Sequence, residues 1–305
     1  YGSFCDASLI ISNHLNLKKY SHTLAPGIRL VYKSAPGKPG NTIYSDCPAL
    51  KHSQKETMTT PLASVGFKTF SPEESLQLAT VVAEKGQRIG TAEGYYVALT
   101  TDTGSQLWAK LDEQNRPYAI TPHYQGKSRN TVLLAQRIKY SNKPLDGRFL
   151  CWINPNQNTP GIGGLPGDYT IIFESPDYAY YSFMEVPCQA VVQFTATARD
   201  LAIFSSVQDY NNYPNRICDV STAMNSSTTA GAEPAYHPEI YLCGTVEETQ
   251  VLENPLTHYY FQWALVKVGN GYFDVCADTA MLEAPMTKGG VIAGNFYVSG
   301  KLILE

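Results

Sequence analysis

Charge is scarce in this chain, and its scarcity narrows the possible partners. Charged residues make up 16% of the 305 residues and the formal net charge is −4, whereas charged residues make up about 25% of a typical globular domain. The sequence therefore has no overall electrostatic attraction for nucleic acid or for an acidic membrane surface. No apolar run approaches the roughly 18 residues of a membrane-spanning helix, so we expect no membrane insertion. No signal peptide is recognisable either.

Paired cysteine motifs are also absent. The chain has seven cysteines, an odd number at wide spacing with no C-x-x-C, which argues against a disulfide scaffold and against a zinc site. Cys151, Cys243 and Cys276 lie inside apolar strand-like patterns, where a free thiol behaves as a small buried hydrophobe. This usage favours a reducing compartment.

Helix signals are concentrated in one segment. Ser71 is a typical N-cap, Pro72 suits the first helical position, and Glu74 completes a capping box. Apolar residues follow at helical spacing, and Gly86 supplies a stop. The sequence predicts one short helix over residues 71–86.

The rest of the sequence has the pattern of strands. Gly269-Asn270-Gly271 between two alternating runs is a hairpin signal. Many strands at short spacing with one helix favour a β-sandwich over βαβ units, and the unequal loops suit a jelly roll. The strands are expected at 6–12, 28–33, 62–70, 94–101, 106–112, 117–123, 131–140, 148–153, 169–174, 189–198, 239–246, 258–268, 271–277 and 294–304.

Two neighbouring runs in the middle of the chain carry a family resemblance. Thr131–Tyr140 and Arg148–Ile153 flank a turn-rich bridge, and the second run stops at Asn154-Pro155. The arrangement resembles consecutive strands in the coat-protein jelly roll of small icosahedral viruses of the nodavirus and tombusvirus type. There a strand carrying Arg is followed by a polar loop, a Gly and a short apolar strand ending near Pro. The alternative is an antiparallel pair of any β-sandwich.

The resemblance implies an all-β fold, an antiparallel jelly-roll β-sandwich with one short helix and a surface projection or long loops. It covers best residues 88–155, and Asn295–Leu304 matches a strand that closes the sandwich. We therefore expect an N-terminal segment at 1–86 and a shell domain at 87–305. The shell domain should carry a projecting insertion near 205–255.

The implied function is that of a structural capsid protein, located in the virion and not an enzyme. Such a protein self-assembles into an icosahedral shell around the genome, so its partners are copies of itself, viral nucleic acid and a host receptor. Coat proteins of this kind use a basic arm to bind the genome. Because Lys18-Lys19 are the only adjacent basic residues, we expect that arm to precede Tyr1. The resemblance leaves open whether the genome is RNA or single-stranded DNA.

Two regions are candidates for contacts. A tyrosine-rich cluster is a candidate interface, because tyrosine buries a large area and keeps a polar tip; the end of a core strand is the alternative. Its residues are Tyr178, Tyr180, Tyr181 and Phe183. A small, polar stretch is a candidate exposed projection. Its residues are Asn225, Ser226, Ser227, Thr228 and Thr229, of which the first three form a formal glycosylation sequon.

Metal binding has little support in the sequence, and we expect no cofactor beyond Ca²⁺ at subunit contacts, as in related coats. Asp274 and Asp278 are the candidate ligands, but no D-x-D-x-D-G cluster supports them. Ordinary surface carboxylates are the favoured interpretation.

Two other functions remain as alternatives. The first is a secreted or surface carbohydrate-binding β-sandwich, with exposed Tyr and Trp as sugar platforms. The second is an aspartic protease, because Asp102-Thr103-Gly104-Ser105 resembles the pepsin-like active-site motif. That chemistry needs a second, facing Asp, and Asp278-Thr279-Ala280 lacks the Gly. The alternative for residues 102–105 is a hairpin turn.

Overall fold

The computed structural model describes residues 60–69, 71–140, 143–156, 166–225 and 237–304. The chain divides into two compact units, Tyr1–Lys55 and Glu56–Glu305, and every described residue belongs to the second. The strands predicted at 6–12 and 28–33 lie outside the described residues. The boundary predicted after residue 86 does not coincide with this division.

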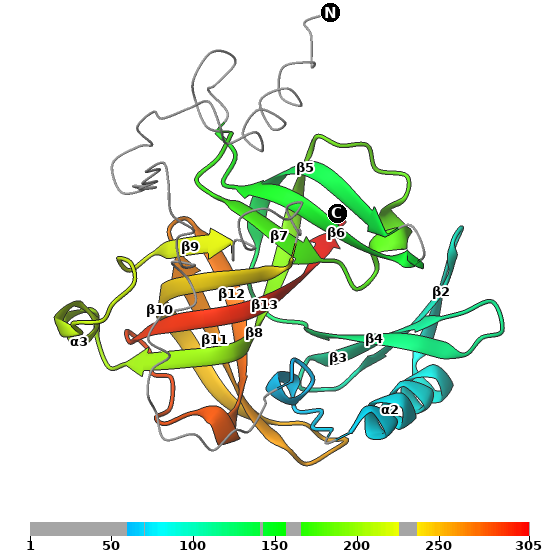
Figure 1. The fold of residues 1–305 in the computed structure, drawn as a ribbon, viewed down its shortest axis with the longest axis horizontal. Coiled ribbons are helices and arrows are strands. Elements are labelled where there is room, and N and C mark those ends of the chain that lie inside the picture. Colours follow the sequence, from blue (N-terminus) through cyan, green and yellow to red (C-terminus); the bar gives the residue numbers. More distant parts are fainter. Residues whose placement is uncertain (1–59, 70, 141–142, 157–165, 226–236, 305) are drawn as a thin grey trace, which may run out of the picture. The chain divides into compact units, whose positions relative to one another are not determined.

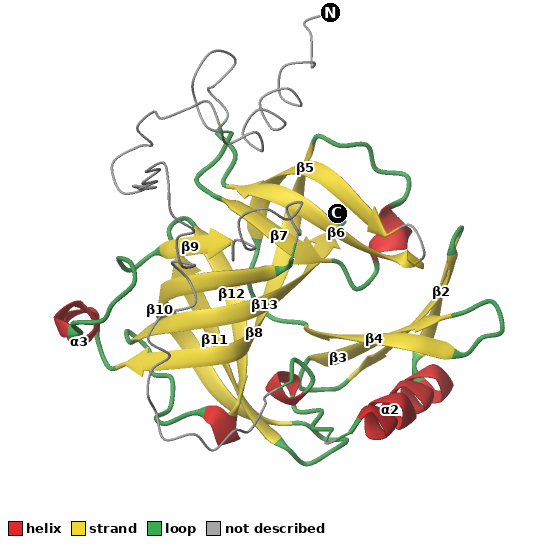
Figure 2. Cartoon of the chain, in the orientation of Figure 1, coloured by secondary structure: helices red, strands yellow, loops and turns green. Residues whose placement is uncertain are grey.

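Strands dominate the described residues and form two sheets (Figure 2). The small sheet contains β1 (Gln87–Thr91), β2 (Gly94–Thr100), β3 (Ser105–Leu111) and β4 (Pro117–Tyr124), in that order. The large sheet contains β5 (Asn130–Tyr140), β6 (Lys143–Ile153), β7 (Thr170–Glu174), β8 (Cys188–Phe204), β9 (Thr222–Asn225), β10 (Glu239–Glu253), β11 (Tyr260–Val268), β12 (Gly271–Asp278) and β13 (Val291–Ile303). The all-β, two-sheet architecture predicted from the sequence is confirmed.

Two long strands, β8 and β13, form the middle of the large sheet (Figure 1). They pair antiparallel from Phe204 and Val291 to Val191 and Ile303; we call this pair the β8–β13 ribbon. Strands β5, β6 and β7 lead from β8 back to β13, and strands β12, β11 and β10 do so by a second route. The large sheet is therefore two closed rings that share the ribbon.

The direction of strand pairing differs in one respect from the antiparallel jelly roll that the sequence predicted. The pairing of β8 with β12 is parallel over three residues, and that of β7 with β13 is parallel at Glu174 and Ser299. These short parallel contacts close the two rings, because β8 and β13 already pair with each other.

One hydrophobic core runs through both rings. Four phenylalanine rings form a row across it, with centroid separations of 5.5 Å between Phe149 and Phe173, 5.2 Å between Phe173 and Phe194, and 5.6 Å between Phe194 and Phe273. All four side chains are fully buried. Buried aromatic pairs of this kind stabilise a fold beyond the area that they bury.

The predicted helix is confirmed as α2 (Pro72–Lys85). The Ser71 side chain accepts a hydrogen bond from the Glu74 N–H at 3.1 Å, which is the predicted N-cap. Gly86 ends the helix in an extended conformation, not a left-handed one. Helix α2 packs on the small sheet through Val82, so it belongs to the same body as residues 87–305.

Both predicted hairpin turns are confirmed. Gly269 takes a left-handed φ of 59° between β11 and β12, and Gly104 takes a φ of 91° between β2 and β3. The latter turn is closed by the Thr101 N–H to the Ser105 carbonyl.

Other expectations need correction. Residues 62–70 contain a 3₁₀ turn, η1 (Ala63–Val65), and no strand among those described. The predicted bridge at 141–147 is mostly strand, because β6 begins at Lys143. Residues 239–253 of the expected projecting insertion near 205–255 form β10, which pairs with β9, β11 and β13. Only residues 226–236 of that region lie outside the described part.

Candidate functional site

The tyrosine cluster divides between core and surface. Tyr178 and Tyr181 are buried, with at most 2% of the side chain exposed, so predicting them as interface residues was wrong. They lie in the 3₁₀ turn η2 (Tyr178–Tyr181), which is not the end of a core strand. Tyr180 and Phe183 remain exposed at 45% and 67%, so only these two can meet another molecule.

Asn225 is not part of a projection. It ends β9 and is half-buried, and its side-chain amide donates to the carbonyl and to the hydroxyl of Thr170, both at 3.1 Å. The other predicted projection residues lie outside the described residues; they are Ser226, Ser227, Thr228 and Thr229.

Asp274 is a buried structural acceptor and not a surface metal ligand. Its side chain is fully buried and accepts hydrogen bonds from the backbone N–H groups of Lys127 and Ser128, from the Gln193 amide and from the Trp263 indole, at 2.7–2.9 Å. Four donors saturate both oxygens of a carboxylate, which leaves no lone pair directed at a cation.

Asp278 has structural partners as well. It caps the 3₁₀ turn η3 (Thr279–Met281) by accepting from the Ala280 N–H, and it pairs with Lys68 at 3.1 Å. No group of three or more His, Cys, Asp and Glu side chains suited to a metal ion occurs among the described residues.

The aspartic-protease geometry does not form around Asp102. Asp102 is exposed in the turn between β2 and β3, and it makes no hydrogen bond to Asp278, whose oxygens face Ala280 and Lys68. The turn acceptor is Thr101, whose hydroxyl oxygen accepts from the Ser105 N–H at 3.1 Å.

Tryptophan does not provide sugar platforms. Trp108 and Trp263 are 3% and 4% exposed, and Trp152 is half-buried in β6. The Trp element of the carbohydrate-binding alternative is therefore not supported by the fold.

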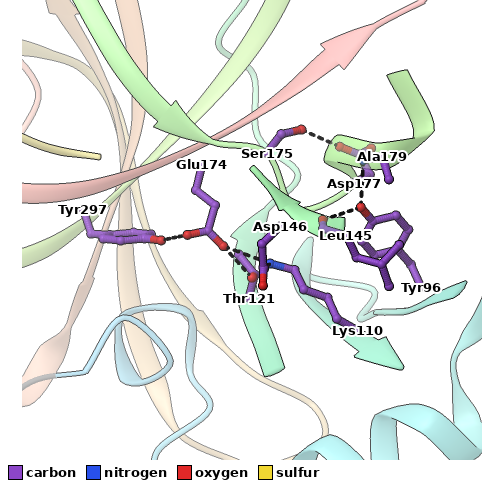
Figure 3. A network of polar contacts seen from close by, with 10 residues as sticks. All are labelled: Tyr96, Lys110, Thr121, Leu145, Asp146, Glu174, Ser175, Asp177, Ala179 and Tyr297. Carbon is purple, nitrogen blue, oxygen red and sulfur yellow. Dashed lines mark hydrogen bonds and ion pairs between the residues drawn. The ribbon is translucent and has the colours of Figure 1, made fainter. Parts of the chain in front are cut away.

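The most concentrated polar chemistry lies between the small sheet and the large one, centred on Lys110 (Figure 3). Lys110 of β3 is 1% exposed and pairs with Asp146 of β6 and, at 3.1 Å, with Glu174 of β7. Glu174 also accepts from the hydroxyls of Thr121 and Tyr297. Three strands, β3, β6 and β7, thus bring one buried cation and two carboxylates together, and β4 and β13 supply the two hydroxyls.

These groups hold one another in the charged state. Burial alone would lower the pKa of Lys110, but the charges of Glu174 and Asp146 outweigh it and raise the pKa above its ordinary value. Burial alone would raise the pKa of Glu174, but Lys110 and the Tyr297 hydroxyl outweigh it and lower the pKa. The ion-paired group is therefore stable near neutral pH.

A second buried relay runs through His123 of β4. Its Nε2 lies 2.8 Å from Gln193 Oε1, and its Nδ1 lies 2.8 Å from the Ser299 hydroxyl. Because the Gln193 amide nitrogen donates to Asp274, its oxygen is the acceptor. Nε2 then carries the proton and Nδ1 accepts from Ser299. Burial, with the charge of Lys301, lowers the pKa of His123 to about 3.

The Ser299–His123 pair resembles a nucleophile and its base, but its position prevents that role. His123 is 0% exposed and Ser299 is 1% exposed, so no substrate can reach the hydroxyl. The relay fixes the small sheet on the β8–β13 ribbon, which is a structural task.

A cavity of about 680 Å³ lies beside the Lys110 group. One part of its wall is polar and includes Lys110, Thr121, Tyr140, Lys143, Asp146, Arg148, Glu174 and Tyr297. The other part is largely apolar and includes Thr60, Pro61, Leu62, Ala119, Ile120 and Pro122. Its volume is in the usual range of small-molecule sites, roughly 300–1,000 Å³.

The tip of the β10–β11 hairpin is the most apolar exposed feature close in sequence. Val251, Leu256, Tyr259 and Tyr260 are 54%, 55%, 40% and 51% exposed; we call them the hairpin-tip patch. Val251 and Tyr260 are diagonal neighbours on one face of the hairpin, since Val251 pairs with Gln262. Contiguous exposed apolar surface commonly marks an interaction site.

The hairpin tip is held in one conformation. The Asn254 amide donates to the Val65 carbonyl, and the Thr257 hydroxyl donates to the Gly66 carbonyl. Gly66 takes a left-handed φ of 79° there, and its Cα lies against Asn254. The patch is therefore preorganised for contact with a partner.

The buried polar groups were not predicted from the sequence. Lys110 had a detectable signal, because it is the one charge in the otherwise uncharged strand Ser105–Leu111. His123 had none, since its partners are 70 and 176 residues away in the chain.

None of the helices in the described part of the chain has both the length and the apolar character needed to cross a membrane. No protein-family model, curated protein or solved structure matches the sequence.

Proposed function

We propose that this chain is a structural coat protein whose copies assemble into an icosahedral shell around a viral genome, in the virion. Three features support the proposal. They are the all-β, two-sheet fold, the resemblance of residues 88–155 to nodavirus and tombusvirus coats, and an exposed apolar surface.

The observation that carries the proposal is the hairpin-tip patch. Four large apolar or aromatic side chains remain 40% to 55% exposed on one rigid element. Association buries such side chains, and aromatic residues are enriched where proteins meet.

A second copy of the chain is the partner that we infer. Tyr180 and Phe183 form another exposed aromatic pair. Tyr180 lies in η2, and Phe183 follows two residues after its end, in a separate part of the fold. Two different patches on one subunit suit heterologous contacts, in which one patch binds the other patch of a neighbouring copy. Such contacts close into rings or shells when the rotation that relates neighbouring copies permits closure. The low fraction of charged residues, 16%, reduces the desolvation cost of burying so much surface.

Assembly of the full chain tests the proposal. We expect closed particles in electron micrographs and a fast-sedimenting species in analytical ultracentrifugation. Leu256→Ser with Tyr260→Ser should remove or weaken assembly, because both side chains are exposed and contribute little to folding. Leu76→Ser is the matched control, since Leu76 is 58% exposed on α2 and is not one of the patch residues; this variant should assemble as wild type does.

Two outcomes contradict the proposal. One is a wild-type chain that stays monomeric at every salt concentration and pH tested. The other is assembly that the double variant leaves unchanged and the Leu76→Ser control reduces, since the contact would then lie on α2.

A further inference from the structure

We propose that the cavity beside Lys110 binds a small amphipathic organic anion, with a carboxylate or similar head and an apolar body. The proposal is independent of shell assembly, because none of the residues of the hairpin-tip patch lines the cavity. It rests on the unequal use of donors and acceptors in the cavity wall.

Both carboxylates in the wall already face an internal cation. Glu174 accepts from Lys110, Thr121 and Tyr297, and Asp146 accepts from Lys110. A cationic ligand would compete with these internal donors for the same oxygens. The arrangement therefore disfavours an ammonium or guanidinium head.

A donor in the wall remains unused. The Tyr140 hydroxyl is buried and has no hydrogen-bond partner among the described residues. Buried polar groups in native proteins nearly always have a partner. A ligand oxygen in the cavity would accept from this hydroxyl and remove the cost of leaving it unpaired.

The charge of the wall has the sign that an anion needs. Lys110, Lys143 and Arg148 give three positive charges, and Asp146 and Glu174 give two negative ones, which leaves a net charge of +1. Lys143 is exposed at the start of β6, three residues after Tyr140. Lys143 lies opposite Tyr140 in the register of β5 and β6, and the Arg148 guanidinium lies 5.0 Å from the centroid of the Tyr140 ring, so two of the positive charges lie close to the unused donor.

The apolar part of the wall accounts for the apolar body of the ligand. Ile120, Pro122, Pro61 and Leu62 contribute apolar side chains without a charge. Burying an apolar ligand body against these side chains is favourable, whereas a purely ionic ligand would leave them in contact with water. An aliphatic or aromatic carboxylate satisfies both walls.

Three ligands with one chain and different heads test the class. Isothermal titration calorimetry of the full chain would use octanoate, octan-1-ol and octylammonium. We expect saturable binding of octanoate, weaker binding of octan-1-ol and the weakest binding of octylammonium.

Substitutions in the cavity wall test where the head group of the ligand binds. Tyr140→Phe should weaken octanoate about tenfold, the usual effect of removing a hydrogen bond to a charged group, and Lys143→Gln about threefold. Lys139→Gln is the matched control, because Lys139 is also exposed but does not line the cavity; it should bind as wild type does. Without ligand, Tyr140→Phe should unfold at the same or a higher temperature, since it removes only an unpaired hydroxyl.

Several results overturn the proposal. They are no saturable binding of any of the three ligands, tightest binding of octylammonium, or octanoate affinity that Tyr140→Phe and Lys143→Gln leave unchanged. Loss of octanoate binding in Leu256→Ser would also overturn it, because the ligand would then occupy the hairpin-tip patch.

Discussion

Replacing His123 by glutamine should flatten the dependence of stability on pH. In the folded chain the pKa of His123 is lowered to about 3 from an ordinary value of 6.5, chiefly by burial. The unfolded chain therefore binds a proton below about pH 6.5 that the folded chain does not bind until about pH 3. Stability from this group is complete above pH 6.5 and falls as the pH drops below it.

The magnitude follows from the difference in proton binding. Between pH 7.5 and pH 5, protonation of His123 in the unfolded chain should lower the free energy of unfolding by about 2 kcal/mol. Glutamine can keep both neighbours, donating to Gln193 and accepting from Ser299, but it does not titrate. The gap in unfolding free energy between wild type and His123→Gln should therefore shrink by about 2 kcal/mol over this interval.

Urea denaturation at both pH values, at one protein concentration, measures that gap. Carboxylates that titrate in the same interval affect both proteins and cancel in the comparison. His237→Gln is the control, because His237 is exposed and its loss should leave the wild-type pH dependence intact. A gap that stays constant from pH 7.5 to pH 5 would show that His123 is not held neutral by burial.

Four further substitutions, two at buried contacts and two in the turn between β2 and β3, can be tested by urea denaturation. Lys110→Met should lower the free energy of unfolding by about 3–5 kcal/mol, because it leaves two buried carboxylates without their cation; a loss under about 1 kcal/mol would contradict this. Gly126→Ala places a Cβ 2.1 Å from the Asp274 carboxyl group and should cost about 1–3 kcal/mol; a neutral effect would show that Asp274 can move aside. Thr101→Val should cost about 1 kcal/mol through its lost turn acceptor, and Asp102→Asn less than about 0.5 kcal/mol. The reverse order would show that Asp102, and not Thr101, stabilises the turn.

Local signals predicted local structure well. The Ser71 cap, the turn at Gly104 and the turn at Gly269 each depend on a few adjacent residues, and all three were identified. The segment 62–70 was misassigned because its apolar residues alternate like those of a strand. Their burial comes instead from packing against β11, which no local pattern reports.

The candidate site depended on contacts between distant residues. Tyr178 and Tyr180 are alike in sequence, yet one lies under Phe149 at a centroid distance of 5.1 Å and the other faces outward. Their difference follows from the direction of η2 on the large sheet. In the same way, no local pattern indicates that Asp146 pairs with Lys110 of β3, which lies 36 residues earlier in the chain.

The β8–β13 ribbon has a consequence for how the fold comes apart. The two rings pair with different halves of this continuous ribbon: β5 and β7 pair at Cys188–Val192 and Ser299, and β12 and β10 pair at Thr195–Thr197 and Val291–Tyr297. The row of phenylalanines runs from Phe149 in one ring to Phe273 in the other, through Phe194 of β8, so loosening the packing in one ring removes packing from the other. Amide hydrogens on both strands should therefore exchange together, with the slowest rates in the chain, as one cooperative unit and not as two halves. A pulling force applied along β13 would likewise act on both rings at once, because β13 pairs with a strand of each. Such a subunit would resist stress from several directions.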